Sequence, residues 1–172
     1  MSLVDAFEKS VTAAAATVEC VARDAEQIAV AVARIAPAGP LAVAEPLCLP
    51  SSLFDACRRL PGAFDARSRK AMDDCAVGIT DAFAGVAHSG SICVCIDHEY
   101  AGYVSLLSRF HVAVLAAENI VERPGDLFRP DCLNGDGLRH NFVFITGPSA
   151  TADMGPLVRG VHGPHRLHVI VV

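Results

Sequence analysis

The chain has 172 residues, a length that suits one domain with one sizeable core, and its hydrophobic fraction of 52% excludes a disordered protein. The formal net charge is −5, and the densest basic cluster, residues 67–70, holds only three basic side chains, which argues against nucleic-acid binding. Charges and prolines interrupt the apolar stretch over residues 28–49, and Asp5 and Glu8 stand where a signal peptide would be basic, so we expect a cytoplasmic protein without membrane insertion.

The first 74 residues predict short elements separated by alanine-rich sequence. We expect a helix over residues 3–13 capped by Ser2, a strand over 17–22 and a helix from Asp24 to Ile35. One long helix through this region is the alternative, because alanine suits helices better than strands. A strand over 41–47, a helical turn from Ser51 or Ser52 to Arg59, and surface structure over 61–74 follow.

From residue 75 onward, strands alternate with helices. Strands are expected over 76–80, 91–96, 111–116, 141–146 and 166–172, and helices over 81–87, 100–109 and, broken, 149–159. The strands are nearly continuous in apolar residues, which is typical of strands covered on both faces. The pattern predicts a single α/β domain over residues 1–172, with a mostly parallel sheet flanked by helices.

Two segments in the last hundred residues carry recognisable sequence motifs. The first is Val-Gly-Ile-Thr-Asp-Ala-Phe-Ala-Gly-Val-Ala-His-Ser-Gly-Ser over residues 77–91. The second is Thr-Gly-Pro-Ser-Ala-Thr-Ala-Asp over 146–153, followed by Leu-Val-Arg-Gly-Val-His-Gly-Pro over 157–164. Both segments resemble the LUD-domain family, and residues 106–107 and 111–112 between them look like the middle segment of that family.

The resemblance implies a fold similar to that of glucosamine-6-phosphate deaminase, ribose-5-phosphate isomerase and CoA transferases. It also implies an accessory subunit of a lactate-utilization system, which oxidises lactate to pyruvate, acting with iron–sulfur partner proteins. Two positions depart from the family pattern: His88 stands where the family has an acidic residue, and Gly155 replaces a glutamate. A covalent transferase needs a carboxylate nucleophile, so the departure at residue 88 weakens the alternative of a CoA-transferase-like or sugar-phosphate-isomerase-like enzyme. A sensor that binds a small anion without chemistry is a further alternative.

A small anionic ligand is expected at the Gly-Pro-Ser-Ala-Thr loop over residues 147–151, between a predicted strand and a predicted helix. Free N–H groups at a helix start attract anions, and ligands of α/β sheets bind at the carboxyl ends of strands. Ser149 and Thr151 can equally be simple helix caps. The candidate ligand-binding residues are Thr80, Ser89, Gly90, Ser91, Gly147, Pro148, Ser149, Thr151, His162 and Gly163.

The catalytic candidates are His88, Asp81 and Asp153, each with a structural alternative. His88 can act as an acid or base near neutral pH, or lie at a helix end for dipole reasons alone. Asp153 can be a general base, or it can fix the loop by accepting backbone hydrogen bonds.

No metal or other cofactor is expected. The seven cysteines are scattered and odd in number, which fits reduced thiols rather than a disulfide framework. Cys93 and Cys95 share one face of a strand, as two core residues would, and no Cys-x-x-Cys pair accompanies His162, His165 and His168.

Overall fold

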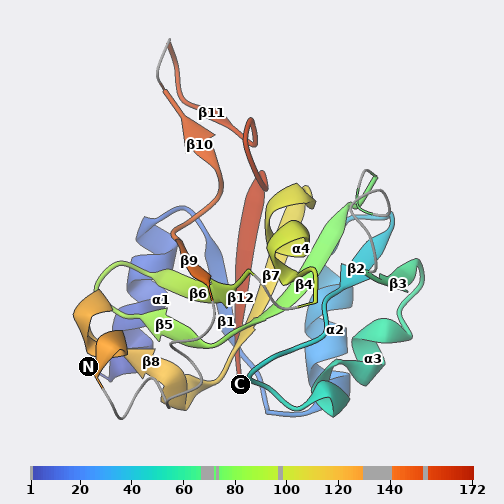
Figure 1. The fold of residues 1–172 in the computed structure, drawn as a ribbon, viewed down its shortest axis with the longest axis horizontal. Coiled ribbons are helices and arrows are strands. Elements are labelled where there is room, and N and C mark those ends of the chain that lie inside the picture. Colours follow the sequence, from blue (N-terminus) through green and yellow to red (C-terminus); the bar gives the residue numbers. More distant parts are fainter. Residues whose placement is uncertain (1, 67–71, 73, 97–98, 130–140, 153–154) are drawn as a thin grey trace.

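The computed structural model describes residues 2–66, 72, 74–96, 99–129, 141–152 and 155–172. Its centre is a six-stranded sheet in the order β1-β12-β7-β4-β2-β3, in which every neighbouring pair is parallel (Figure 1). The strands are β1 (Thr17–Cys20), β2 (Leu41–Val43), β3 (Ala63–Asp65), β4 (Val77–Ala82), β7 (Phe110–Leu115) and β12 (Arg166–Val171). The predicted α/β architecture with a mostly parallel central sheet is confirmed.

Four helices accompany this sheet, and local caps explain where the first two begin. They are α1 (Leu3–Ala13), α2 (Ala25–Ile35), α3 (Asp55–Arg58) and α4 (Ala101–Leu107). Ser2 and Asp5 form a reciprocal capping box on α1, and the Asp24 carboxylate accepts the second and third N–H groups of α2. The predicted division of this region into helix, strand and helix is confirmed, because Ala15 turns left-handed (φ 63°) after α1.

A second sheet lies beside the first and has the order β8-β5-β6-β9. Its strands are β5 (Ala84–Val86), β6 (Ser91–Cys95), β8 (Ile120–Val121) and β9 (Phe142–Ile145). β5 and β8 are parallel, whereas β6 is antiparallel to both β5 and β9. A small hairpin of β10 (Ala150–Thr151) and β11 (Val158–Arg159) stands out from the body of the molecule (Figure 1). Short 3-10 helices cover Ser51–Phe54, Ala117–Asn119 and Pro124–Phe128.

The second sheet corrects part of the sequence prediction. The strands expected over 91–96 and 141–146 exist as β6 and β9, but they pair antiparallel with each other and belong to the second sheet. Their apolar runs indicated burial on both faces, and burial does not determine pairing direction. The tight turn over residues 87–90 reverses the chain and makes β6 antiparallel to β5.

Two predicted helices are wrong. Residues 81–87 hold the end of β4 and all of β5, so Asp81 is a strand residue and not a helix cap. The described residues of the segment 149–159 form the β10–β11 hairpin instead of a broken helix. A short strand, β3, also lies within the region 61–74 that was expected to be only surface structure.

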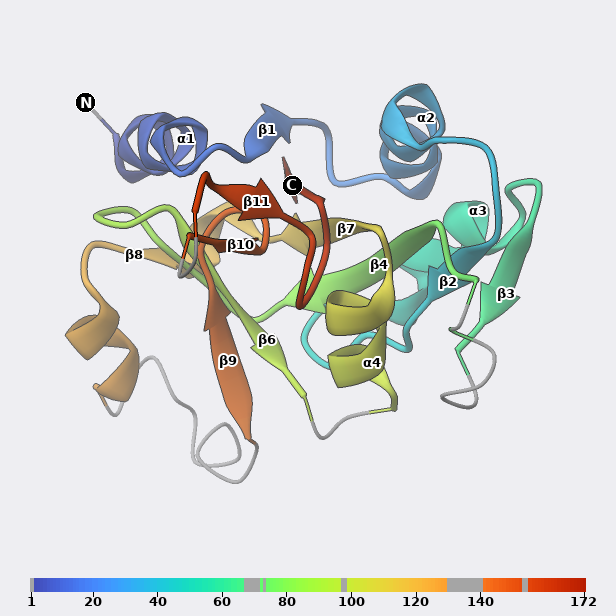
Figure 2. The same ribbon diagram turned by 90° about the horizontal axis from the view of Figure 1, so that it is seen from above.

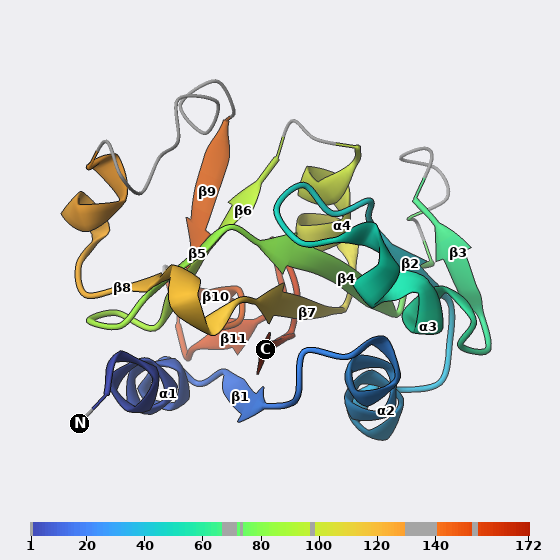
Figure 3. The same cartoon turned by 90° about the horizontal axis from the view of Figure 1, so that it is seen from below.

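Apolar side chains cover both faces of the parallel sheet. On one face, α2 and α3 pack against residues of β4 and β7, among them Ile28, Phe54 and Val112. On the other face lie α4 and the second sheet, as Figures 2 and 3 show from opposite sides, with Val104 and Ile92 in the same apolar cluster. Within the described residues, no helix is long and apolar enough to cross a bilayer.

Candidate functional site

A cavity of about 850 Å³ opens where β7 and β12 begin. One wall is α4, a second is β9, and two loops, residues 146–150 and 162–164, complete it. His111 and Leu167, each the second residue of its strand, belong to the lining. The cavity therefore lies at the amino edge of the parallel sheet, opposite to the edge where the sequence led us to expect a site. We call it the amino-edge pocket.

His111 is the buried polar side chain of this pocket. Its Nε2 lies 2.9 Å from the hydroxyl oxygen of Thr80 on the adjacent strand β4, and the ring is fully buried. Its Nδ1 is buried and has no hydrogen-bond partner among the described residues. Burial lowers the pKa of His111 to about 3, so the ring is neutral at physiological pH. A neutral imidazole can donate or accept a hydrogen bond, but it offers no charge to a ligand.

Beside His111, the described lining holds one further histidine, His162. No Lys, Arg, Asp or Glu is among the described residues that line the amino-edge pocket. Its side-chain polar groups come from Tyr103, Ser105, Thr146, Ser149, His111 and His162. The other lining residues are apolar side chains of α4, β9 and β12, together with glycines and prolines. The pocket therefore resembles a site for a small organic molecule more than a site for a phosphate.

The Gly-Pro-Ser loop is held in place by backbone contacts. Gly147 has a φ of 70°, and a Cβ there would lie 2.1 Å from the carbonyl oxygen of Ala14 at the end of α1. The Ser149 N–H donates to the carbonyl of Pro164 at 2.9 Å, and its carbonyl accepts from Gly160 at 2.8 Å. No helix begins here, so the physical reason given for an anion site at this loop is wrong: the Ser149 N–H is already used.

The structure brings half of the candidate ligand-binding residues to the amino-edge pocket. The lining includes Gly147, Pro148, Ser149, His162 and Gly163. Thr151 lines a smaller depression that also includes His162, and Thr80 reaches the pocket only through its hydrogen bond to His111. The two ends of the second signature segment, residues 147–149 and 162–163, thus meet beside α4.

The turn between β5 and β6 approaches the pocket from another side. The hydroxyls of Ser89 and Ser91 lie 2.6 Å apart, and Ser91 lies 2.7 Å from the hydroxyl of Thr146, which lines the pocket. Gly90 has a φ of 68°, and a Cβ there would lie 2.4 Å from the backbone nitrogen of Val11. Gly90 therefore lets the turn pack against α1, and its role in the described contacts is structural.

The family model for the LUD domain matches residues 56–172, which include every residue of the amino-edge pocket. This chain belongs to the LUD-domain family. The matched region begins within α3 and contains all later elements, so both signature segments lie in it.

Curated relatives and one solved structure are similar to this LUD protein. Lactate utilization protein C of Bacillus subtilis (strain 168) is 35% identical over 100 residues, which cover 56% of this chain and 42% of the relative. Lactate utilization protein C of Oceanobacillus iheyensis is 32% identical over 100 residues, with 56% and 43% covered. The match thus spans less than half of each relative. A crystal structure of a DUF162 family protein from Deinococcus radiodurans has a TM-score of 0.72 at 20% identity, covering 99% of this chain and 96% of that one, and shows the same fold.

The carboxylate of Asp81 makes structural hydrogen bonds in this LUD domain. Its side chain is 6% exposed, and one carboxylate oxygen accepts the backbone N–H groups of Cys48 at 2.6 Å and Leu49 at 3.1 Å. These contacts hold the loop that follows β2 against the end of β4. His88 is exposed in the turn after β5, outside the amino-edge pocket. Asp153, the third catalytic candidate, lies outside the described residues.

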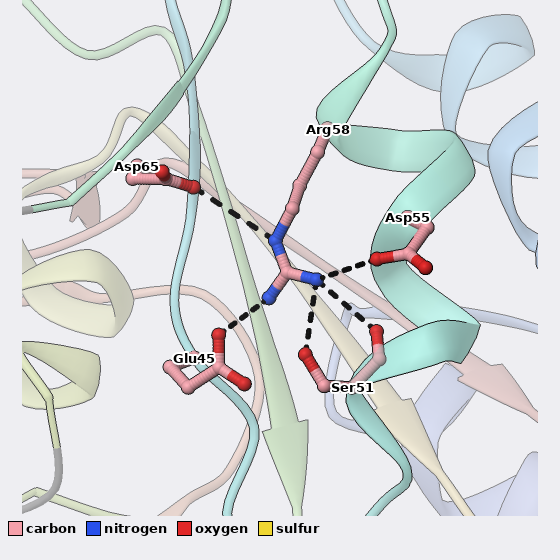
Figure 4. A network of polar contacts seen from close by, with 5 residues as sticks. All are labelled: Glu45, Ser51, Asp55, Arg58 and Asp65. Atoms are coloured by element: carbon pink, nitrogen blue, oxygen red, sulfur yellow. Dashed lines mark hydrogen bonds and ion pairs between the residues drawn. The ribbon is translucent and has the colours of Figure 1, made fainter.

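Charged side chains gather instead near the carboxyl ends of β2 and β3. The Arg58 guanidinium reaches Glu45 at 2.7 Å, Asp55 at 3.1 Å and Asp65 at 3.8 Å (Figure 4). It also donates to the carbonyl and hydroxyl oxygens of Ser51, both at 3.1 Å. These contacts tie α3 to the loop after β2 and to the end of β3, so the arginine is engaged by the protein's own groups.

The described thiols are poorly suited to nucleophilic chemistry. Burial raises the pKa of Cys93 to about 12 and that of Cys57 to about 11, and burial together with the nearby Asp81 carboxylate raises the pKa of Cys48 to about 12. These groups are therefore protonated thiols near neutral pH. Among the described residues, no group of three or more His, Cys, Asp and Glu side chains is placed to hold a metal ion.

Sequence reasoning missed the polar centre of the pocket. His111 was assigned to a buried strand and compared with the family's middle segment, but it was not named as a site residue. A histidine within the apolar run Phe110–Leu115 was the available indication, because a buried polar side chain needs a partner. Tyr103 and Leu106 on α4 were missed for another reason: nothing in the sequence indicates which face of that helix meets β9.

Proposed function

We propose that this LUD domain serves a lactate-utilization system as an accessory, ligand-binding subunit that acts with iron–sulfur partner proteins in the cytoplasm. The observation that carries the proposal is the 35% identity with lactate utilization protein C of Bacillus subtilis. The family-matched region, residues 56–172, contains the whole amino-edge pocket, so the similarity extends to the part of the chain that can bind a ligand.

The site chemistry supports an accessory role over a transferase. Covalent transfer of an acyl group through the enzyme needs a carboxylate nucleophile in the site. No carboxylate lines the described part of the amino-edge pocket, His88 stands at the position where the family resemblance implied an acid, and Asp81 is engaged by two backbone N–H groups. A sugar-phosphate isomerase is disfavoured as well, because the described lining provides no cation for a phosphate.

Gene deletion in the host tests the proposed role. The deletion strain should fail to grow on lactate as the carbon source and should grow normally on glucose. The wild-type gene on a plasmid should restore growth, and the tagged chain should co-purify with iron–sulfur proteins, identified by mass spectrometry and by their visible absorption. Normal growth of the deletion strain on lactate would refute the role.

Incubation of the pure protein with acyl-CoA donors and carboxylate acceptors tests the alternative. We expect no acyl transfer above the rate of the uncatalysed reaction. Turnover that survives repeated purification would show that the accessory role is wrong and that a nucleophile lies elsewhere in the chain.

A further inference from the structure

We propose that the amino-edge pocket binds an uncharged organic molecule with an apolar body and one hydrogen-bonding head group, and that His111 anchors the head group. This inference goes beyond the proposed function, because it means that the carboxylate of lactate is not the ligand of this pocket. It stands on the geometry of the cavity and does not require the lactate-utilization role.

The first argument concerns charge. A carboxylate or phosphate that leaves water for a site without a cation loses several kcal/mol of hydration free energy. The described lining has no Lys or Arg side chain. Arg109 borders a smaller depression that shares Leu106 and Gly163 with the amino-edge pocket, and Arg166 lies over the ring of Phe110 at 4.3 Å. An anion in the amino-edge pocket would therefore find no Lys or Arg side chain among the described lining residues.

The second argument concerns the unpartnered ring nitrogen. Thr80 fixes the imidazole through Nε2, which leaves Nδ1 of His111 buried without a partner among the described residues. If the threonine hydroxyl donates, Nδ1 carries the proton and donates to the ligand; if the hydroxyl accepts, Nδ1 is an acceptor. A buried polar group without a partner costs about 1–3 kcal/mol, so a head group that reaches Nδ1 after a small turn of the ring toward the cavity regains that free energy on binding.

The third argument concerns the walls. Side chains of Leu106, Val143, Ile145 and Leu167 line the pocket, together with the rings of Tyr103 and Phe144. Leu106 is 52% exposed, Tyr103 44% and Phe144 42%, which is unusual for large apolar side chains that share one cavity. A ligand with an apolar body would cover them, and the volume of about 850 Å³ suits a molecule of several rings or a short chain.

A single tryptophan can report on occupancy, because the chain contains no Trp. Tyr103→Trp places the reporter in the pocket, and Phe128→Trp, at a side chain 57% exposed and outside the pocket, is the matched control. The probes are benzamide and benzoate, which share size and shape but differ in charge. We expect benzamide to change the emission of Tyr103→Trp saturably and to leave Phe128→Trp unchanged, whereas benzoate binds at least about tenfold more weakly.

His111 is then tested in the reporter protein. His111→Leu should weaken benzamide at least about tenfold and leave toluene, which has no head group, bound as before; His111→Gln should recover part of the loss. If His111→Leu does not fold, Thr80→Val, which removes only the hydroxyl that orients the ring, should weaken benzamide in the same selective way. Benzoate binding as tightly as benzamide, no saturable change with either probe, or equal losses for benzamide and toluene would overturn the proposal. Each of these results leaves the growth test on lactate unaffected, so the two proposals fail separately.

Discussion

The two edges of the parallel sheet differ in how their polar side chains are used. At the carboxyl edge, Asp81 and Arg58 are charged, and the protein's own backbone and side chains satisfy them. At the amino edge, His111 is neutral, half of its hydrogen-bonding capacity is unused, and a cavity adjoins it. Ligands of open α/β sheets usually bind at the carboxyl edge. In this LUD domain, the Nδ1 of His111, which has no partner among the described residues, places the candidate site at the amino edge together with the adjoining cavity.

The largest effect is expected from removing the carboxylate of Asp81. Asp81→Ala should lower the free energy of unfolding by about 4 kcal/mol, because one buried and one partly buried N–H group lose a charged acceptor, at about 1–3 kcal/mol each. Urea denaturation measures the change, and Asp81→Asn, which keeps an oxygen acceptor, should lose less. Wild-type stability of Asp81→Ala would mean that the carboxyl edge is not structural and would reopen a catalytic role for this residue.

Lowering the pH should decrease the free energy of unfolding through His111 at the amino edge. The folded pKa is about 3 and the ordinary value is 6.5, so between these pH values the unfolded chain binds a proton that the folded chain does not. Stability from this group is therefore complete above pH 6.5 and falls by about 1.4 kcal/mol per pH unit below it, or about 3 kcal/mol by pH 4. His111→Gln should show a flatter decline of unfolding free energy over this range.

The titration of His168 does not affect the comparison of wild type with His111→Gln. Burial lowers its pKa too, with partial opposition from the nearby Glu19 carboxylate, and its contribution is present in both proteins. If wild type and His111→Gln decline with equal slopes from pH 6.5 to pH 4, the imidazole of His111 is not buried and neutral, and the contrast between the two edges is lost.

A smaller effect is expected at Arg58, because its partners are about half exposed and water screens the ion pairs. Arg58→Met should cost about 1 kcal/mol of unfolding free energy, and the difference from wild type should shrink in 1 M salt. Arg58→Lys should recover little of it, because one ammonium cannot reach the three separate groups that the planar guanidinium contacts (Figure 4). An Arg58→Lys protein as stable as wild type would show that charge alone is what this edge requires.

The smallest effect is expected at His88. His88→Ala should change the free energy of unfolding by no more than about 0.5 kcal/mol, because the side chain is exposed. It should also leave benzamide binding to the Tyr103→Trp reporter unchanged, since residue 88 lies outside the amino-edge pocket. A loss of binding would place the β5–β6 turn in the site after all.

The elements that sequence analysis predicted correctly are those whose ends are determined by neighbouring residues. Asp24 begins α2, and the helix ends at Ile35, just before Pro37, which agrees with the expected bounds within one residue. The failures depend on distant partners. β6 has an apolar sequence that would suit either sheet, and its direction is fixed by the turn at Gly90 and by pairing with β9 about fifty residues later.

The site was predicted only in part, and the physical reason is the same dependence on distant partners. The loop residues Gly147, Ser149 and His162 were recognisable because they lie in two short family-like motifs. His111 pairs with a threonine 31 residues earlier, and only the register between β4 and β7 makes that contact. Sequence reasoning also could not predict that Lys, Arg, Asp and Glu are missing from the described lining, because this depends on which side chains the fold places at the pocket.

The path of β4 has a mechanical consequence. This strand passes directly into β5 with only Phe83 between them, and its neighbour β7 leads into β8 through the 3-10 helix Ala117–Asn119. Because β4 pairs with β7 and β5 pairs with β8, both in parallel, the same two segments of the chain supply a strand pair to each sheet. We therefore expect the two sheets to open together, so that amides of β6 and β12 exchange with solvent at similar rates.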